Sequence, residues 1–103
     1  MILSEITPTA STMTLLYSNN AGNGASGDLR FINQSNIAVD YIQVAVTTNY
    51  VDLPTNKSFI MYNSTVPAAQ SVGISEISLG KNQGLFVYSL NGTTNFTYVG
   101  NTF

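Results

Sequence analysis

The stretch Gly84–Gly100 reads GLFVYSLNGTTNFTYVG and decides the fold class, because two runs of β-forming residues flank an Asn-Gly pair. Each run alternates between two faces, and neither run contains a charged residue. Asn-Gly favours a type I′ hairpin turn, since that turn needs positive φ at both central residues. We therefore expect a β-hairpin with its turn at Asn91-Gly92, one strand face in the core and the other in contact with a partner.

The rest of the chain has the same character as this stretch. Short runs of β-forming residues are separated by turn residues about every 8–12 positions, and no segment longer than a turn has helical periodicity. The pattern predicts one all-β domain, an antiparallel β-sandwich of about seven or eight short strands. We expect an Ig-like arrangement, with a jelly roll as the alternative. Residues 1–11 are expected to form an extended N-terminal arm, because Pro8 disfavours a helix, and residues 12–103 the sandwich domain.

Three local features modify this simple pattern. Val39–Val46 is the clearest central strand, but Asp40 falls on its buried-face parity, which predicts a bulge or a strand entry there. Val72–Leu79 changes phase at Glu76. Ser18–Gly27, SNNAGNGASG, has the composition of a flexible loop.

The composition indicates a protein that works through contact. Charged residues make up 8% of the chain, against roughly 25% in soluble domains, and asparagine, threonine and serine together number 35. A weakly charged surface suits permanent contact with neighbours, although an ordinary small domain is the alternative. The only basic residues are Arg30, Lys57 and Lys81, too few for a nucleic-acid path or a polybasic membrane patch. We expect no nucleic-acid partner and no membrane association.

The sequence offers little for catalysis. It contains no histidine and no cysteine, which excludes a Ser-His-Asp triad, a thiol nucleophile and a zinc site of the usual kind. The five acidic residues are widely spaced, and the nearest approach to a calcium motif has one acid among Asn19, Asn20, Asn23 and Asp28. We predict no catalytic residues, no metal and no cofactor, and hence a protein that is not an enzyme.

Candidate contact residues lie in the segments expected outside the strands. The proposed arm supplies Ile2, Leu3 and Ile6, the long loop after the central strand supplies Tyr50, and the chain ends at Phe103. Aromatic side chains give a large contact area at low entropic cost, which suits an interface.

Five segments between Leu29 and Gly100 resemble a known family. They are FINQS (Phe31–Ser35), IQVAV (Ile42–Val46), SFIMYN (Ser58–Asn63), ISLGKNQGLFVYS (Ile77–Ser89) and FTYVG (Phe96–Gly100). Together they resemble small β-sandwich virion structural proteins of tailed bacteriophages, including cyanophages. The N-terminal third departs from that family, because SNNAGNGASG stands where a short turn is usual.

The resemblance implies a structural role in a virion. The chain would be a capsid decoration (cement) protein, which stabilises the shell by contacting the major capsid protein or other virion proteins, and it would act as a homo-oligomer. A neck, tail or baseplate accessory protein is the alternative within this class. A carbohydrate-binding or adhesive module is the alternative from another class.

Overall fold

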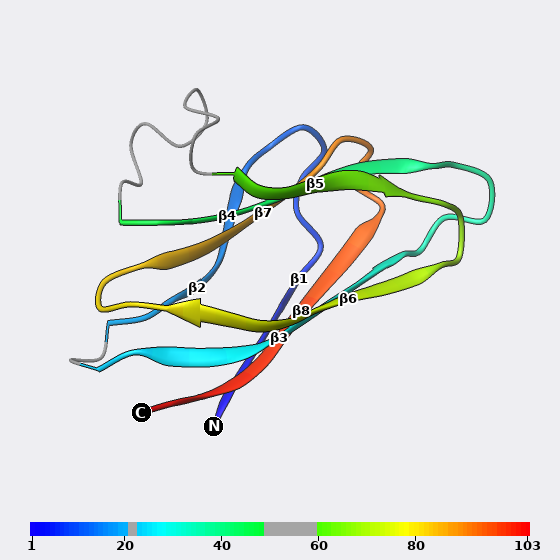
Figure 1. The fold of residues 1–103 in the computed structure, drawn as a ribbon. Helices are drawn as coiled ribbons and strands as arrows, with labels where there is room; N and C mark the ends of the chain where they lie inside the picture. Colours follow the sequence, from blue (N-terminus) through cyan, green and yellow to red (C-terminus); the bar gives the residue numbers. More distant parts are fainter. Residues whose placement is uncertain (21–22, 49–59) are drawn as a thin grey trace.

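A computed structural model of the protein describes residues 1–20, 23–48 and 60–103. Within these ranges the chain forms eight antiparallel strands and no helix, and the strands make two sheets of four (Figure 1). The predicted all-β sandwich is confirmed. The strands are β1 (Ile2–Ile6), β2 (Thr14–Ser18), β3 (Ala25–Asn33), β4 (Asp40–Thr47), β5 (Ile60–Val66), β6 (Ser71–Leu79), β7 (Gly84–Ser89) and β8 (Thr94–Thr102).

The order of the strands is that of a jelly roll. The first sheet runs β1-β8-β3-β6 and the second runs β2-β7-β4-β5. Successive strands therefore alternate between the sheets, except that β4 and β5 pair directly. An Ig-like sandwich places its first two strands side by side in one sheet, whereas β1 and β2 lie in different sheets here. The alternative arrangement, the jelly roll, is the observed one.

The hairpin expected at Asn91-Gly92 is wrong. Strand β7 pairs with β2 and β4, while β8 pairs with β1 and β3, so the turn carries the chain from one sheet to the other. Gly92 has a φ of 71°, but Asn91 is not among the residues with positive φ, so the turn is not type I′. A hairpin and a crossing turn would each bury one face of both runs. Two strands joined by the crossing turn point their inward faces at each other across the core.

The core fills the space between the two sheets and is built from alternate residues of each strand. Phe31 is its centre, with its ring centroid 5.6 Å from that of Phe96 and 5.8 Å from that of Tyr62. Tyr98 is fully buried, and its hydroxyl donates a hydrogen bond of 2.8 Å to the carbonyl of Ile77. Burial raises the pKa of Tyr98 to about 12, so its hydroxyl stays a neutral donor.

The predicted phase change at Glu76 is confirmed. Glu76 has a φ of 58°, and the pairing of β3 with β6 shifts register between Gly27 and Leu29. Asp28 lies at this irregularity, and its Oδ1 accepts a hydrogen bond of 3.0 Å from the backbone nitrogen of Glu76. The extra residue lets both halves of β6 keep their apolar side chains on the inner face.

Two boundaries expected from the sequence move in the structure. Residues 2–6 pair with β8 as an edge strand, and Ile2 is buried, so the sandwich begins at Ile2 rather than at residue 12. Strand β3 begins at Ala25, inside the stretch expected to be a loop. The polar and glycine-rich composition of this stretch does not indicate a strand. Its extended conformation is determined instead by pairing with both β6 and β8.

Two facing glycines set the spacing of β3 and β8. Gly27 pairs with Gly100, and a Cβ on Gly100 would lie 2.6 Å from the Cα of Gly27 and closer still to the carbonyl oxygen of Ser26. We expect Gly100→Ala to destabilise the fold by about 2–3 kcal/mol, because backbone atoms must shift to admit the methyl group. Urea unfolding measures this free energy.

Gly73→Ala is the matched control for this substitution. Gly73 also lies in the first sheet, but the nearest atom to an added Cβ, the carbonyl oxygen of Leu29, is 3.6 Å away. The control should unfold within about 0.5 kcal/mol of the wild type or be slightly more stable. Equal losses in both variants would contradict the close approach of β3 and β8.

Candidate interaction surfaces

Asp40 is the one charged residue that is buried in the described part of the chain. It is the first residue of β4, as the parity of that strand indicated. Its Oδ1 accepts a hydrogen bond of 2.9 Å from the backbone nitrogen of Asn91. Its Oδ2 accepts from the hydroxyls of Ser89, Thr93 and Thr94 and from the backbone nitrogen of Thr93. One carboxylate therefore binds the end of β7, the crossing turn and the start of β8.

The electrostatics of this network favour the ionised carboxylate. Burial by itself would raise the pKa of Asp40, but the hydrogen bonds from Ser89, Asn91, Thr94 and Thr93 outweigh burial and lower the pKa below 3.8. Both carboxylate oxygens accept hydrogen bonds from the chain itself. The network accordingly positions the turns rather than offering an acid or a base to a substrate.

The turns held by Asp40 present an apolar surface, here called the loop-end patch and formed by Ile37, Val39 and Leu90. The Asn91 side chain donates to the carbonyl of Val39 at 2.7 Å, and the backbone nitrogen of Leu90 donates to the carbonyl of Tyr41 at 2.9 Å. Ile37 is 96% exposed, Val39 54% and Leu90 46%. These hydrogen bonds hold the backbone at Val39 and Leu90, whose large apolar side chains stay exposed, as does that of Ile37.

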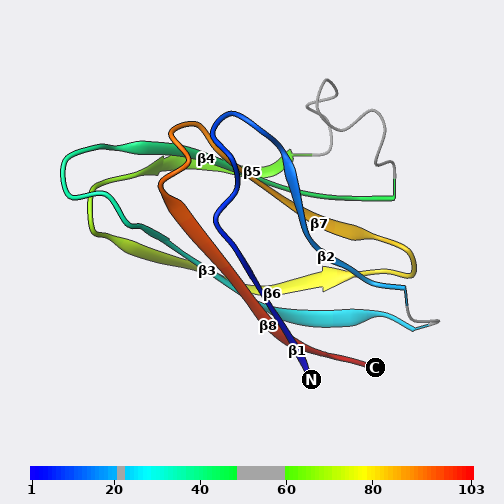
Figure 2. The same ribbon diagram turned by 180° about the vertical axis from the view of Figure 1, so that it is seen from behind.

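A second apolar surface, the terminal corner, lies at the other end of the sandwich. It consists of Met1, Leu3, Val99 and Phe103, all exposed, and both chain termini lie in this region (Figures 1 and 2). Leu3 and Val99 are cross-strand partners. The backbone nitrogen of Phe103 donates to the carbonyl of Gly24 at 2.9 Å, which fixes the last residue against the start of β3.

The candidate contact residues separate into three groups. Ile2 is buried and Ile6 is packed against the core, so neither is free for contact; they alternate with Leu3 along β1 and face the opposite sheet. Leu3 is 65% exposed and Phe103 is 74% exposed, and both belong to the terminal corner. Tyr50 lies outside the described residues.

The sequence reasoning did not identify the loop-end patch. The signal was available, because Ile37 and Val39 are large apolar residues directly after the turn residues Gln34-Ser35-Asn36. The sequence pattern places Val39 at the start of the central strand Val39–Val46 and assigns Ile37 to no element. Only their exposure shows that they lie outside the core.

The outer face of the second sheet forms a third surface, here called the uncharged face. Its strands carry no charged residue apart from Asp40, which points inward. On this outer side Gln43 lies between Tyr88 and Asn63, and Tyr41 lies opposite Thr65. Ala45 and Phe86 also lie on the outer side, where they are buried in a small cluster with Met13 and Ile60. The face comprises Leu15, Tyr41, Gln43, Met61, Asn63, Thr65 and Tyr88.

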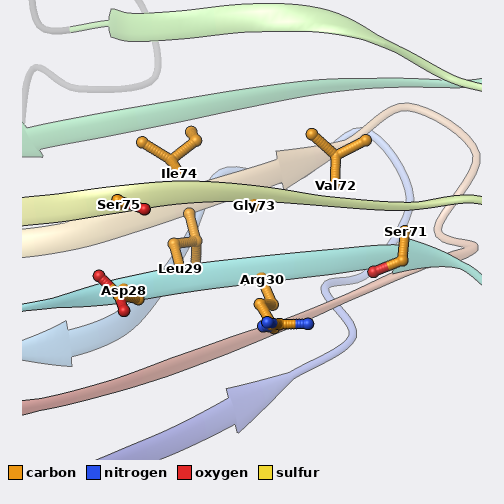
Figure 3. Close-up of a pocket in the computed structure, with 8 residues that line it drawn as sticks. All are labelled: Asp28, Leu29, Arg30, Ser71, Val72, Gly73, Ile74 and Ser75. Atoms are coloured by element: carbon orange, nitrogen blue, oxygen red, sulfur yellow. The ribbon is translucent and has the colours of Figure 1, made fainter.

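The first sheet bears charge and a shallow groove between β3 and β6. The groove has a volume of about 220 Å³, and Asp28, Arg30 and Ser71 point to its outer side while Leu29 and Val72 point toward the second sheet (Figure 3). Gly73 leaves space because it has no side chain. The Oδ1 of Asp28 accepts the hydrogen bond from Glu76, so the groove offers the second carboxylate oxygen of Asp28, one guanidinium and serine hydroxyls for polar contact.

The side chains considered for calcium do not converge. Asn19 is fully buried, and its amide nitrogen donates to the carbonyls of Asn23, Leu79 and Gly80, which fastens the β2–β3 connection to the end of β6. Asp28 points outward on β3. Over residues 1–20, 23–48 and 60–103 no group of three or more acidic, histidine or cysteine side chains could hold a metal ion. In the same ranges no helix could span a membrane.

Comparison with known proteins adds no identity to these surfaces. No family model, curated protein or solved structure matches the chain.

The Asp40 network generates a prediction about pH. Because the pKa of Asp40 is lowered in the folded protein, its stabilisation is complete at neutral pH and is lost as the pH falls through 3.8 toward the folded pKa. We expect Asp40→Asn to cost about 2–3 kcal/mol at neutral pH, since an amide group would face hydrogen-bond donors. The difference between wild type and variant should shrink as the pH is lowered from about 6 to about 3.

Urea unfolding at a series of pH values measures this difference. The control is Glu5→Gln, which removes an exposed carboxylate and should unfold within about 0.5 kcal/mol of the wild type at neutral pH. A difference between wild type and Asp40→Asn that stays constant down to about pH 3 would contradict the stabilised carboxylate.

Proposed function

We propose that this chain is a non-enzymatic structural protein of a phage virion and that it decorates the capsid, stabilising the shell through protein–protein contacts. The observation that carries the proposal is the placement of exposed apolar side chains at both ends of the sandwich, in the terminal corner and in the loop-end patch. A protein that bridges neighbouring capsomers has to contact more than one of them. A module that binds a single ligand needs one such surface.

The architecture supports the same role by analogy. Jelly rolls with this strand order occur in viral capsid proteins and also in lectins, so the fold alone does not choose between them. The resemblance of segments such as FINQS (Phe31–Ser35) and FTYVG (Phe96–Gly100) to phage virion proteins favours the capsid role. The low fraction of charged residues suits a protein in permanent contact with its neighbours.

The energetics suit a cement protein. Each side chain of the size of Leu, Ile or Phe contributes about 1.5–3 kcal/mol when it is fully removed from water. Leu3, Phe103 and Ile37 are all more than half exposed. The backbones of Leu3 and Phe103 are held by strand pairing and by a hydrogen bond to Gly24, so little further ordering opposes burial of these two side chains. Many copies on one shell would multiply this gain without any chemical step.

The alternatives differ in location or in class. A neck, tail or baseplate accessory protein would use the same surfaces on another part of the virion. A carbohydrate-binding module typically stacks exposed aromatic rings on sugar faces, and Phe103 is the one exposed aromatic residue among those the structure describes. No specific observation therefore favours carbohydrate binding over the capsid role.

Mass spectrometry and imaging of purified particles test the proposal directly. The chain should be found in virions on the shell surface, and its absence from particles would exclude the structural role. Location on the tail would replace decoration by the accessory role.

Two point variants test the contact surfaces. Leu3→Lys and Ile37→Lys place a charge in the terminal corner and in the loop-end patch, and each should weaken binding to undecorated particles at least about tenfold, because an apolar contact is replaced by a buried charge. Ser75→Lys, at an exposed position on edge strand β6, is the control and should bind normally. Normal binding by both patch variants would refute these contact surfaces.

A further inference from the structure

We propose that Asn23-Gly24 is a site of spontaneous deamidation in the folded protein, whereas the Asp40 network protects Asn91-Gly92 from the same reaction. These are the two Asn-Gly pairs of the sequence. The inference goes beyond the proposed function, because it concerns a chemical change in the purified chain and needs no virion.

Deamidation at an Asn-Gly pair requires only the chain and water. The backbone nitrogen of the glycine attacks Cγ of the asparagine, a carbon–nitrogen bond forms, and the bond from Cγ to Nδ2 breaks. The proton of the glycine N–H leaves with the amide nitrogen as ammonia. Water then opens the cyclic imide to aspartate or isoaspartate. Glycine favours the reaction, because it has no side chain to hinder the backbone rotation that brings its nitrogen to Cγ.

Hydrogen bonds hold both reacting nitrogens of Asn91-Gly92. The leaving group, Nδ2 of Asn91, donates to the carbonyl of Val39 at 2.7 Å, and the attacking nitrogen of Gly92 donates to Oγ of Ser89 at 2.9 Å. The backbone nitrogen of Asn91 donates to Oδ1 of Asp40 at 2.9 Å. Because these partners come from different segments, the ring can close only after the turn has opened.

The acceptor of the Gly92 nitrogen is itself fixed. The Ser89 hydroxyl donates to the buried carboxylate of Asp40, which also accepts from the hydroxyl of Thr94. Opening of the turn therefore disturbs the whole set of donors around a buried ion, which is costly. A slow reaction that needs a rarely open state proceeds in proportion to the population of that state. Deamidation at Asn91 should thus be slow while the protein is folded.

The other pair, Asn23-Gly24, is held by a residue beyond the end of β8. Nδ2 of Asn23 donates to the main-chain oxygen of Phe103 at 2.7 Å, and the nitrogen of Phe103 donates to the carbonyl of Gly24 at 2.9 Å. Phe103 is 74% exposed, and such positions open at lower cost than buried networks. Both asparagine side chains are exposed, so hydrogen bonding rather than access of water separates the two pairs.

The two products would affect different parts of the molecule. A carboxylate at position 23 faces the main-chain oxygen of Phe103 with an acceptor in place of a donor, which releases that residue from the start of β3. A carboxylate at position 91 would face the carbonyl of Val39 and disrupt the crossing turn. The folded chain is therefore expected to change first at the terminal corner, while the Asp40 network stays intact.

Peptide mapping by mass spectrometry of the full chain, incubated in mildly alkaline buffer, measures both sites in one sample. In the folded wild type Asn23 should convert at least about tenfold faster than Asn91, and in urea that unfolds the chain the two rates should agree within about threefold. Equal rates in the folded protein would overturn the proposal. So would faster conversion at Asn91, which would mean that the Ser89–Asp40 pair promotes the attack.

One variant tests whether the protection is local. Ser89→Ala removes the acceptor of the Gly92 N–H, and it should raise the rate at Asn91 at least about tenfold, with Asn23 as the internal reference. Gly100→Ala is the matched control, because it strains the first sheet and leaves the Asp40 network in place, so the Asn91 rate should stay within about threefold of the wild type. Equal acceleration at Asn91 in both variants would refute local protection.

Circular dichroism shows whether each variant is folded. If Ser89→Ala is not, the comparison between folded and unfolded wild type decides the proposal by itself. Failure here is separable from failure of the proposed function, because the deamidation rates are measured on the isolated chain and its presence in virions is measured on particles.

Discussion

The hydrogen bonds to the Asp40 carboxylate are the interaction on which the rest of the structure depends. The chain leaves the second sheet at Ser89 and enters the first at Thr94, and both residues donate to the same carboxylate at the start of β4. Four residues separate these strand ends, so the crossing is short and its backbone groups need partners. A buried ion is stable there because donors from three segments surround it, which also holds the two sheets in a fixed relation.

A second constraint acts on the spacing of strands within the first sheet. The facing glycines Gly27 and Gly100 let β3 and β8 approach closely beneath the ring of Tyr98. The Tyr98 hydroxyl reaches the carbonyl of Ile77 on the neighbouring strand β6, and its ring lies 5.9 Å from that of Tyr17 on the second sheet. Small residues on one pair of strands thus make room for the large aromatic side chain that joins both sheets.

These constraints place the surfaces that matter for function. The Asp40 network fixes the turns that carry Val39 and Leu90, and the pairing of β1 with β8 fixes Leu3 beside Val99. Among the described strands, the exposed charged residues lie on the first sheet. The described strands thus combine exposed apolar side chains at both ends of the sandwich with charges that lie mostly on the first sheet.

The sequence by itself determined the all-β class, most strand positions, the strand entry at Asp40 and the phase change at Glu76. Each follows from a period of two along the strand, which is a local property. It did not determine that β7 and β8 belong to different sheets, because alternation is identical in a hairpin and in a crossing turn. Nor did it show that Ile2 is core while Ile37 is surface, since residue type alone does not separate two isoleucines that lie near the ends of strands. Only the pairing of distant strands decided these points, because burial is a property of the neighbours that tertiary structure brings together.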